Sequence, residues 1–223
     1  YVIDCRGYPE DYSDYIITDK VYLDSGIVVK SFTPGDWEYT YHIAHEHGWM
    51  FGIPLQKTTG WGYLWNSEVT SELEAQSNLI NLLGEYQVEY FSEDCRQFKF
   101  KNYYAKSIVN EDGNIFVNGN RALFLEPIQA TSLGCYGLIN GLIIDSIENK
   151  HYDHEKYTTV MDEVIKFINL HYYNGSNYNT PFWNRAQEGA REVLNGINPE
   201  KYDWKYVIDW TPQFRQKMFE SFL

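Results

Sequence analysis

The first half of the chain alternates hydrophobic and polar positions in the manner of β-strands. The longest alternation runs over residues 39–53, where aromatic, apolar and histidine side chains occupy every second position. Side chains spaced in this way share one face of an extended segment, so we expect one extended stretch with a single aromatic face. The pattern also predicts a short strand that runs into the Gly-Pro turn of residues 1–9, a strand pair over residues 21–32 that turns at residues 24–26, and an aromatic strand over residues 61–65.

Helical spacing replaces this alternation in one segment of the first half. Ser71 and Glu74 have the spacing of a capping box, apolar residues follow at helical intervals, and Gly84 stands where the helix would end. A hairpin is expected over residues 98–118, with its turn at residues 111–113.

After Pro127 the pattern is helical almost to the end of the chain. The expected helices span residues 129–148, 154–173, 181–194 and 212–223. We therefore expect an α+β fold, in which a mixed and mostly antiparallel sheet is followed by C-terminal helices. Residues 1–128 would form a sheet-rich part and residues 129–223 a helical part, and the two would share one core.

Composition and charge narrow the class of protein. The chain has 223 residues, and its 31 acidic and 18 basic side chains give a net charge of −13. This charge argues against a nucleic-acid partner, because phosphate binding requires an excess of Lys and Arg. An aromatic content of 17% excludes intrinsic disorder. The longest apolar run, residues 133–144, is interrupted by Asn140 and is shorter than the roughly 18–20 residues of a membrane span, so no membrane partner is expected.

Cysteine content and the first residues indicate the compartment. The three cysteines are widely spaced and odd in number, which indicates neither a disulfide framework nor a CxxC metal site. They are Cys5, Cys95 and Cys135. The chain starts at Tyr1 without a basic and apolar signal segment, so we expect a reducing, cytoplasmic location.

Three histidines, His42, His45 and His47, are close enough in sequence to suggest a metal site. No nearby Cys or Asp completes a familiar ligand pattern, so we expect structural or substrate-lining histidines and no metal. The sequence also contains no GxSxG turn, no P-loop and no GxGxxG turn, the motifs of common hydrolases, nucleotide-binding and dinucleotide-binding proteins.

Residues 117–132 combine a strand, a glycine turn, a proline-containing loop and the start of a helix. The backbone N–H groups of residues 129–132 are expected to be free at the helix start, where an anion or a polarised oxygen could bind. Gly134, Gly137 and Gly141 follow along one stripe of that helix and let a flat group approach its backbone. A capped helix packed closely on a sheet explains the same residues equally well.

Five ordered segments resemble the flavin-dependent halogenases of the tryptophan halogenase family, a branch of the FAD monooxygenase-like fold. Residues 1–8 are similar to the family's Ile-Asp-Cys-Ser-Gly-Phe strand, and residues 48–55 to its Gly-Trp-x-Trp-x-Ile-Pro-Leu signature. Residues 60–67 resemble its Gly-x-Gly-Tyr-Val-Tyr-Ser strand, and residues 119–132 its Gly-x-Ala-x-Phe-Leu-Glu-Pro-Leu-Glu-Ser-Thr loop. The fifth segment consists of His171 and Tyr172 followed by Pro181, Phe182 and Trp183.

The resemblance implies an oxidoreductase. In this family, reduced FAD, oxygen and a halide give hypohalous acid, which halogenates an electron-rich aromatic substrate such as an indole or a phenol. A flavin reductase supplies the reduced FAD. Two other functions stay open, namely an FAD-dependent monooxygenase on the same scaffold and a non-catalytic binding or partner subunit.

The resemblance also assigns roles to residues. Thr131 and Ser132 match the dipeptide that holds the halide. Trp49 and Phe51 match the aromatic side chains between flavin and substrate, and Gln129 stands where the family has a substrate-positioning Glu. The residues that match the flavin-lining loop are Gly119, Asn120, Phe124, Leu125, Glu126 and Pro127.

The chain departs from the family pattern at a few of these positions. Phe51 replaces the second Trp of the signature, Gln129 and Ala130 replace Glu-Ser, and Leu123 replaces a small residue. Because Gln carries no charge, it cannot stabilise a cationic intermediate, which argues against free tryptophan as the substrate.

The family's dinucleotide-binding turn and catalytic lysine precede the region that this chain matches. Neither Lys57 nor Lys99 lies in a matching motif. We therefore expect a C-terminal portion from which the N-terminal FAD-binding segment is absent. Its partner would be an N-terminal half or, through an open sheet edge at residues 2–4, a second copy in a homo-oligomer.

Overall fold

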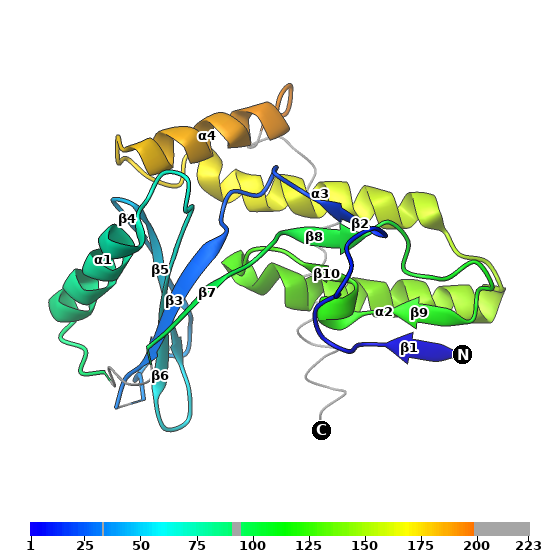
Figure 1. The fold of residues 1–223 in the computed structure, drawn as a ribbon, viewed down its shortest axis with the longest axis horizontal. Coiled ribbons are helices and arrows are strands. Elements are labelled where there is room, and N and C mark those ends of the chain that lie inside the picture. The colour runs from blue at the N-terminus through cyan, green and yellow to red at the C-terminus, as the bar shows by residue number, and fades with distance from the viewer. Residues whose placement is uncertain (33, 91–94, 199–223) are drawn as a thin grey trace. The chain divides into compact units, whose positions relative to one another are not determined.

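The computed structural model describes residues 1–32, 34–90 and 95–198 of the chain, and these form two compact units (Figure 1). Unit 1 contains residues 1–21, residues 102–171 and the described residues from Glu192 onward. Unit 2 contains residues 22–101 and 172–191. Each unit is therefore assembled from segments that are distant in sequence.

Unit 2 is built on a five-stranded antiparallel sheet (Figure 1). Its strands are β3 (Ser25–Lys30), β4 (Tyr41–His45), β5 (Gly48–Pro54), β6 (Thr59–Trp65) and β7 (Arg96–Lys99), in the order β4-β5-β6-β3-β7. Helix α1 (Glu72–Glu85) contacts β6, and most of α4 (Pro181–Val193) belongs to the same unit. The predicted aromatic strand is confirmed as β6, whose Trp61, Tyr63 and Trp65 are buried.

Residues 39–53 form a hairpin of β4 and β5, so the expectation of one extended stretch was wrong. A two-residue turn reverses the chain and pairs His45 with Gly48. As a result, odd-numbered positions of β4 share a face with even-numbered positions of β5. Trp49 and Phe51 therefore lie on the face opposite His45. The alternation of hydrophobic and polar residues continues through the two turn residues without interruption. The sequence pattern therefore gave no sign that the chain reverses direction there.

The expected strand pair over residues 21–32 is the single strand β3. Gly26, expected in a turn, lies within the strand and pairs with Leu64. A Cβ at this position would meet the Phe98 ring at 2.6 Å and the Leu64 side chain at 2.8 Å. The absence of a side chain at Gly26 leaves space for the side chains of Phe98 and Leu64. From the local sequence, a glycine with this packing role looks the same as a glycine in a turn.

Helix α1 begins as predicted. Ser71 Oγ accepts the Glu74 N–H at 3.3 Å, and Glu74 Oε2 accepts the Ser71 N–H at 2.8 Å, which completes the capping box. The helix continues through Gly84 to Glu85, and the left-handed residue that follows it is Gln87, at a φ of 54°. Gly84 is therefore part of the helix and does not end it.

Unit 1 contains two small sheets. In one, β1 (Val2–Asp4) pairs in parallel with β9 (Ile115–Val117). In the other, β8 (Tyr103–Ala105) lies between β2 (Tyr15–Ile17) and β10 (Leu123–Phe124), and both pairings are antiparallel. The short strand expected at the start of the chain is confirmed.

The expected hairpin over residues 98–118 was wrong, although its turn is present. Gly113 has a φ of 69° and donates its N–H to the Asn110 carbonyl oxygen at 3.0 Å. Beyond the turn, β9 pairs with β1, and an isolated bridge joins Val109 to Phe116. The partner of β9 lies more than one hundred residues away, where local sequence carries no signal for the pairing.

Two 3₁₀ turns and two long helices complete unit 1. The turn η2 (Gly119–Arg121) precedes β10, and η3 (Ile128–Ala130) leads into α2 (Thr131–Asn149). Helix α3 (His154–Tyr173) has the predicted bounds. The helix expected over residues 212–223 lies outside the described residues. Together the elements confirm the expected α+β class with mostly antiparallel strands.

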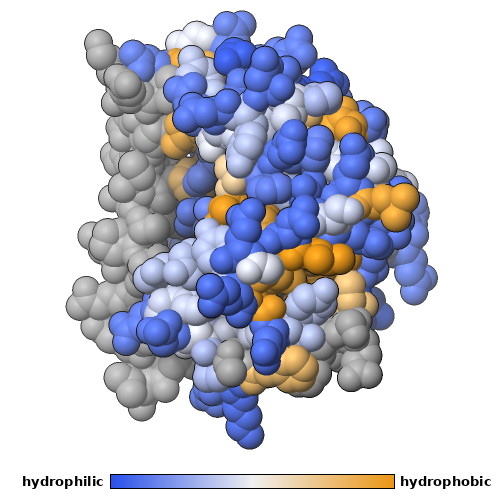
Figure 2. Space-filling view, turned by 90° about the vertical axis from the view of Figure 1, so that its left-hand side faces the viewer, coloured by the Kyte–Doolittle hydropathy of each residue, from blue (hydrophilic) through white to orange (hydrophobic). Residues whose placement is uncertain are grey.

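One stretch of unit 1, Ile128–Asn149, is long and apolar enough to span a membrane by length and composition. In its most apolar window the mean hydropathy is 1.2 and 33% of the window is buried. The core helix of a folded domain passes the same test, so a single such helix is weak evidence for a span. Hydrophilic side chains dominate the face drawn in Figure 2, and apolar residues gather in patches among them.

We predict that Gly48→Ala destabilises unit 2 and that Gly60→Ala does not. A Cβ at residue 48 would lie 2.2 Å from the Leu64 carbonyl oxygen, whereas a Cβ at residue 60 meets no atom within 4 Å. Because the carbonyl belongs to the β5–β6 pairing, Gly48→Ala should lower the free energy of unfolding by about 1–3 kcal/mol. Gly60→Ala should change it by less than about 0.5 kcal/mol. Urea unfolding followed by tryptophan fluorescence measures both, and equal effects would contradict the prediction.

Candidate functional site

The buried side chain of Asn118 fixes the glycine turn of the loop that resembles a flavin-binding segment. Asn118 Oδ1 accepts the Gly119 N–H at 2.7 Å and so caps η2. Asn118 Nδ2 donates to the Tyr136 carbonyl oxygen at 3.1 Å and to Asn140 Oδ1 at 2.7 Å, and both acceptors belong to α2. Gly119 itself has a φ of 61°, a conformation that glycine adopts at little cost.

Three tyrosine hydroxyl groups hold the two residues after this glycine. Tyr103 donates to the Asn120 carbonyl oxygen at 2.5 Å, and Tyr136 donates to Asn120 Oδ1. Tyr15 donates to the Arg121 carbonyl oxygen at 2.7 Å. Burial raises the pKa of Tyr136 to about 12 and also raises the pKa of Tyr103, so both hydroxyl groups stay protonated and remain donors at neutral pH.

A group of ion pairs joins β1 to the same turn. Arg6 donates to both carboxylate oxygens of Asp4 at 2.9 Å, and Arg121 Nε lies 3.5 Å from Asp4 Oδ2. Hydrogen bonds from the Arg6 side chain, and then from its backbone N–H, lower the pKa of Asp4 from 3.8 to about 2. The Asn118 N–H donates to the Asp4 carbonyl oxygen at 3.0 Å, so β1 and the turn form one hydrogen-bonded assembly.

The residues assigned to the flavin loop differ in exposure. Leu125 and Glu126 are 1% and 0% exposed, so neither residue lies at the surface of the loop. Phe124 is half-buried and packs against Tyr8, with ring centroids 5.5 Å apart. The other assigned residues, Gly119, Asn120 and Pro127, are also half-buried.

The two residues assigned to the halide tie the loop to the start of α2. Ser132 Oγ accepts the Leu125 N–H and donates to the Leu125 carbonyl oxygen, both at 3.1 Å. Thr131 donates through both Oγ1, at 2.5 Å, and its backbone N–H to the Ile128 carbonyl oxygen. The Ala130 N–H donates to the Pro127 carbonyl oxygen at 2.9 Å. We expected all N–H groups of residues 129–132 to be free. This was wrong for Ala130 and Thr131, whose N–H groups are engaged because a 3₁₀ turn precedes the helix.

The backbone in front of α2 has an uncommon conformation. Gln129 and Ala130 are exposed and left-handed, at φ values of 54° and 52°. Ala130 (φ 52°, ψ 36°) and Thr131 (φ −52°, ψ −43°) then have opposite hand. Successive residues of opposite hand form a concavity that suits an anion, although in this structure the Ala130 and Thr131 N–H groups already donate to carbonyl oxygens.

In unit 2, three of the resembling segments meet at Trp49, which pairs with Leu64 of β6. Its Nε1 donates to the Tyr172 hydroxyl oxygen at 3.0 Å, and the Tyr172 and Trp183 ring centroids are 6.1 Å apart. Trp183 Nε1 donates to the His45 carbonyl oxygen at 2.7 Å. Trp49 is 3% exposed and so belongs to the core of the unit, whereas Phe51 is half-buried.

The assigned residues are therefore divided between the units. Unit 1 brings together the flavin loop, Gln129, Thr131 and Ser132, and unit 2 contains Trp49 and Phe51. The histidines do not converge, since His42 and His45 lie on opposite faces of β4. Over the ranges that the structure describes, no three His, Cys, Asp or Glu side chains are grouped as a metal ion requires.

Sequence reasoning missed the residues that hold the loop. An Asn directly before a turn glycine is a signal for a cap, and Asn118 could have been found in this way. Tyr15, Tyr103 and Tyr136 carry no such signal, because their partners lie between 16 and 106 residues away.

Comparison with known proteins identifies the family. The tryptophan halogenase family matches residues 5–198, and the chain belongs to this family. Tryptophan 7-halogenase RebH of Lentzea aerocolonigenes is 23% identical over 201 residues, which cover 86% of this chain and 36% of RebH. Tryptophan 6-halogenase SttH of Streptomyces toxytricini is 25% identical over 184 residues, which cover 76% of this chain and 32% of SttH.

Solved structures share the fold. Xcc4156, a flavin-dependent halogenase from Xanthomonas campestris, superposes with a TM-score of 0.68 at 22% identity, over 85% of this chain and 41% of that protein. The chain thus spans 32–41% of the length of these three proteins.

We predict that Asp4 makes the stability of unit 1 depend on pH in the acid range. Its pKa of about 2 in the folded chain lies below the ordinary value of 3.8. Its contribution is therefore complete above about pH 4 and is lost as the pH falls toward 2. Arg6 is 82% exposed, so solvent screening limits this contribution to less than about 1 kcal/mol.

Asp4→Asn should flatten the fall in stability between about pH 4 and pH 2, measured by urea unfolding across that range. Asp112→Asn, in the exposed turn before β9, is the matched charge control and should leave the slope unchanged. A slope that survives Asp4→Asn would assign the acid sensitivity to another group.

Proposed function

We propose that this chain is the part of a flavin-dependent halogenase that contributes the flavin-facing loop, the halide site and a portion of the substrate wall. The observation that supports this most strongly is the union of two segments more than one hundred residues apart. Residues 1–8 and 119–132 meet through the Asp4–Arg121 ion pair and the Tyr8–Phe124 contact, and the adjoining Asn118 N–H donates to the Asp4 carbonyl oxygen. Both segments are ones whose sequence resembles the family's flavin site.

The residues of the loop fit a flat, polar cofactor such as FAD. At Gly119 the left-handed backbone leaves a space that a Cβ would enter, with the nearest neighbouring atom, Cys5 Cβ, at 3.8 Å. In this proposal Gly119, Asn120, Phe124 and Pro127 face the flavin, and the buried residues Leu125 and Glu126 support the loop from behind. When bound, reduced FAD supplies with oxygen the oxidising power that turns a halide into an electrophile.

The halide would lie in front of α2. The opposite hand of Ala130 and Thr131 and the positive end of the helix dipole both favour an anion at Thr131 and Ser132. The Ser132 hydroxyl is engaged with Leu125, so its role is to fix the loop. Halide binding would accordingly depend on backbone N–H groups at the start of α2, and the Thr131 N–H would have to leave the Ile128 carbonyl oxygen to take part.

The substrate would be an electron-rich aromatic compound other than free tryptophan. Gln129 can donate and accept hydrogen bonds, but it supplies no negative charge to a reacting ring. Trp49 and Phe51 would form part of the wall between flavin and substrate. The catalytic lysine, the ADP-binding turn and the remaining substrate walls would come from a part of the protein outside these residues, and a flavin reductase would supply reduced FAD.

The open edge of β1 fits such an additional part. Tyr1, Val2 and Ile3 are 70%, 58% and 48% exposed, and within the described residues β1 pairs with β9 alone. An apolar edge strand of this kind gains stability when another segment covers it. The covering segment would be the N-terminal part of the same enzyme or a second copy.

The decisive experiment combines this chain, joined to or mixed with an N-terminal flavin-binding part of the family, with FAD, a flavin reductase and bromide. We predict brominated products from a panel of indoles and phenols, detected by mass spectrometry. Hydroxylated products that form without halide would instead select an FAD-dependent monooxygenase. Failure of the same assembly to bind FAD would favour a non-catalytic binding or partner subunit.

We further predict that Gly119→Ala weakens FAD binding in that assembly and that Gly113→Ala does not. Both glycines are left-handed, at φ values of 61° and 69°, so the two substitutions introduce similar backbone strain. Gly119 alone belongs to the proposed flavin loop. Gly119→Ala should lower FAD affinity about tenfold or more and reduce FAD-linked thermal stabilisation. Equal losses for both variants would mean that strain, and not contact with FAD, causes the effect.

A further inference from the structure

Unit 2 contains a cavity of about 640 Å³ that the proposed halogenase site does not use. Its walls come from the segment after β3, from β4 and β6, and from the segment after α1. Trp61 lies on its floor. Because Phe51 pairs with Gly62, the neighbouring Trp61 points to the opposite face of the sheet. The cavity and the proposed substrate wall therefore lie on different faces, and one does not extend the other.

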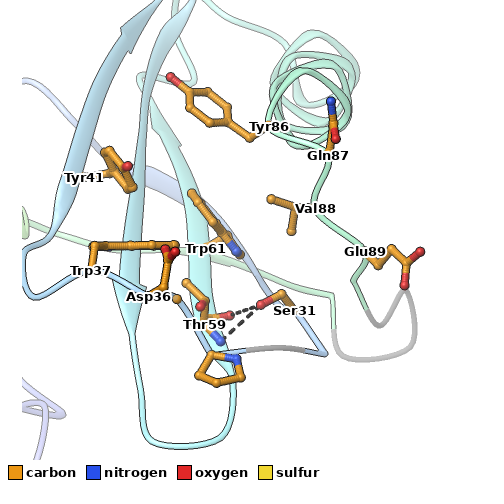
Figure 3. Close-up of a pocket in the computed structure, with 12 residues that line it drawn as sticks. Ser31, Asp36, Trp37, Tyr41, Thr59, Trp61, Tyr86, Gln87, Val88 and Glu89 are labelled. Carbon is orange, nitrogen blue, oxygen red and sulfur yellow. Dashed lines mark hydrogen bonds between the residues drawn. The ribbon is translucent and has the colours of Figure 1, made fainter.

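Four aromatic rings surround this cavity: those of Trp37, Tyr41, Trp61 and Tyr86. The ring centroids of Trp37 lie 4.9 Å from Tyr41 and 5.9 Å from Trp61, and Tyr86 lies 6.2 Å from Tyr41 and 6.4 Å from Trp61. Tyr41 and Trp61 are nearly parallel, at 14°, and Trp37 is inclined to them by 58° and 53°. Figure 3 shows Tyr41 and Trp37 on one side of Trp61 and Val88 on the other.

Two glycines allow the tryptophan rings to occupy these positions. A Cβ at Gly52 would lie 2.4 Å from the Trp61 ring, and a Cβ at Gly35 would lie 2.5 Å from the Trp37 ring. Each ring thus rests on backbone. The aromatic walls are in this way fixed before any ligand arrives, which lowers the entropic cost of binding.

The charge of the cavity has one sign. Asp36 and Glu89 line it, and none of its lining residues is Lys, Arg or His. Aromatic faces carry negative electrostatic potential and attract cations within about 6 Å of the ring centroid. Rings and carboxylates therefore favour the same kind of ligand, a positively charged one.

Two polar atoms specify the ligand further, the indole Nε1 of Trp61 and that of Trp37, which is also buried without a hydrogen-bond partner among the described residues. Trp61 is 2% exposed, and its buried Nε1 has no hydrogen-bond partner among the described residues. A buried N–H without an acceptor is unfavourable by about 1–3 kcal/mol, so a ligand that carries an acceptor gains affinity here. A fully methylated ammonium group has no N–H donor to satisfy, so aromatic faces alone can hold it.

We propose that this cavity binds a quaternary ammonium compound that carries an oxygen acceptor, with choline as the simplest member of the class. The methylated nitrogen lies against Trp37, Tyr41 and Trp61, with Asp36 adding long-range attraction, and the ligand oxygen accepts the Trp61 N–H. The site is independent of flavin and of halogenation.

Calorimetric titration of the full chain with choline, in the absence of flavin, tests the proposal. Choline should bind at one site, and 3,3-dimethylbutan-1-ol, its neutral isostere, should bind at least about fivefold more weakly, because it lacks the cation–π attraction. Higher ionic strength should weaken the binding of choline and leave that of the alcohol unchanged. Equal affinity for the two compounds, or no saturable binding of choline at tens of millimolar, would overturn the proposal.

Variants locate the binding. Trp37→Leu should weaken choline binding about tenfold, and Trp37→Phe, which keeps an aromatic wall, should restore part of it. Asp36→Asn should weaken binding a few-fold, whereas Glu38→Gln removes the same charge from an exposed residue outside the lining and should have no effect. Circular dichroism confirms that each variant is folded. Unchanged binding in folded Trp37→Leu, or equal effects of Asp36→Asn and Glu38→Gln, would contradict the assignment.

Discussion

The amide of Asn118 is the interaction on which the organisation of unit 1 depends. Its oxygen caps the 3₁₀ turn of the candidate loop, its nitrogen donates to two groups of α2, and its backbone N–H donates to β1. Because Asn118 is 4% exposed, water cannot replace these partners, and loss of one leaves a buried polar atom unpaired at a cost of about 1–3 kcal/mol. The strand, the loop and the helix are thus positioned by one side chain, and the tyrosine hydroxyl groups around Asn120 reinforce the same geometry.

Unit 2 is organised by shape complementarity between aromatic rings and glycine. The Trp61 ring covers Gly52 on one face of the sheet, and the Phe51 ring covers Gly62 on the other, at positions directly opposite in the β5–β6 register. A side chain at either glycine would displace the ring. The same two strands can therefore present an aromatic surface on both faces, which is why two proposed sites, with different ligands, can share them.

Features fixed by neighbouring residues were predictable from the sequence. The capping box of Ser71, the bounds of α3 and the turn at residues 111–113 depend on local signals, and the structure has all three. The pairing of β9 with β1 and the reversal between β4 and β5 depend on distant partners or on the phase of a turn. The candidate loop shows both cases, because its motif was recognisable while the burial of Glu126 was not. No propensity scale assigns a left-handed conformation to Gln129 and Ala130. The hydrogen bonds that the Ala130 and Thr131 N–H groups make to carbonyl oxygens could therefore not be predicted from the sequence.

The adjacent left-handed residues also have a consequence for protein engineering. Each costs about 1–2 kcal/mol relative to an ordinary backbone conformation, a cost that Gly would largely remove. A programme that ranks positions by expected gain in thermal stability would therefore choose Gln129 and Ala130 among its first targets. Glycine at both positions would also widen the range of conformations open to the segment before α2. At Gln129 and Ala130, a gain in thermal stability and a fixed loop geometry are therefore opposing aims.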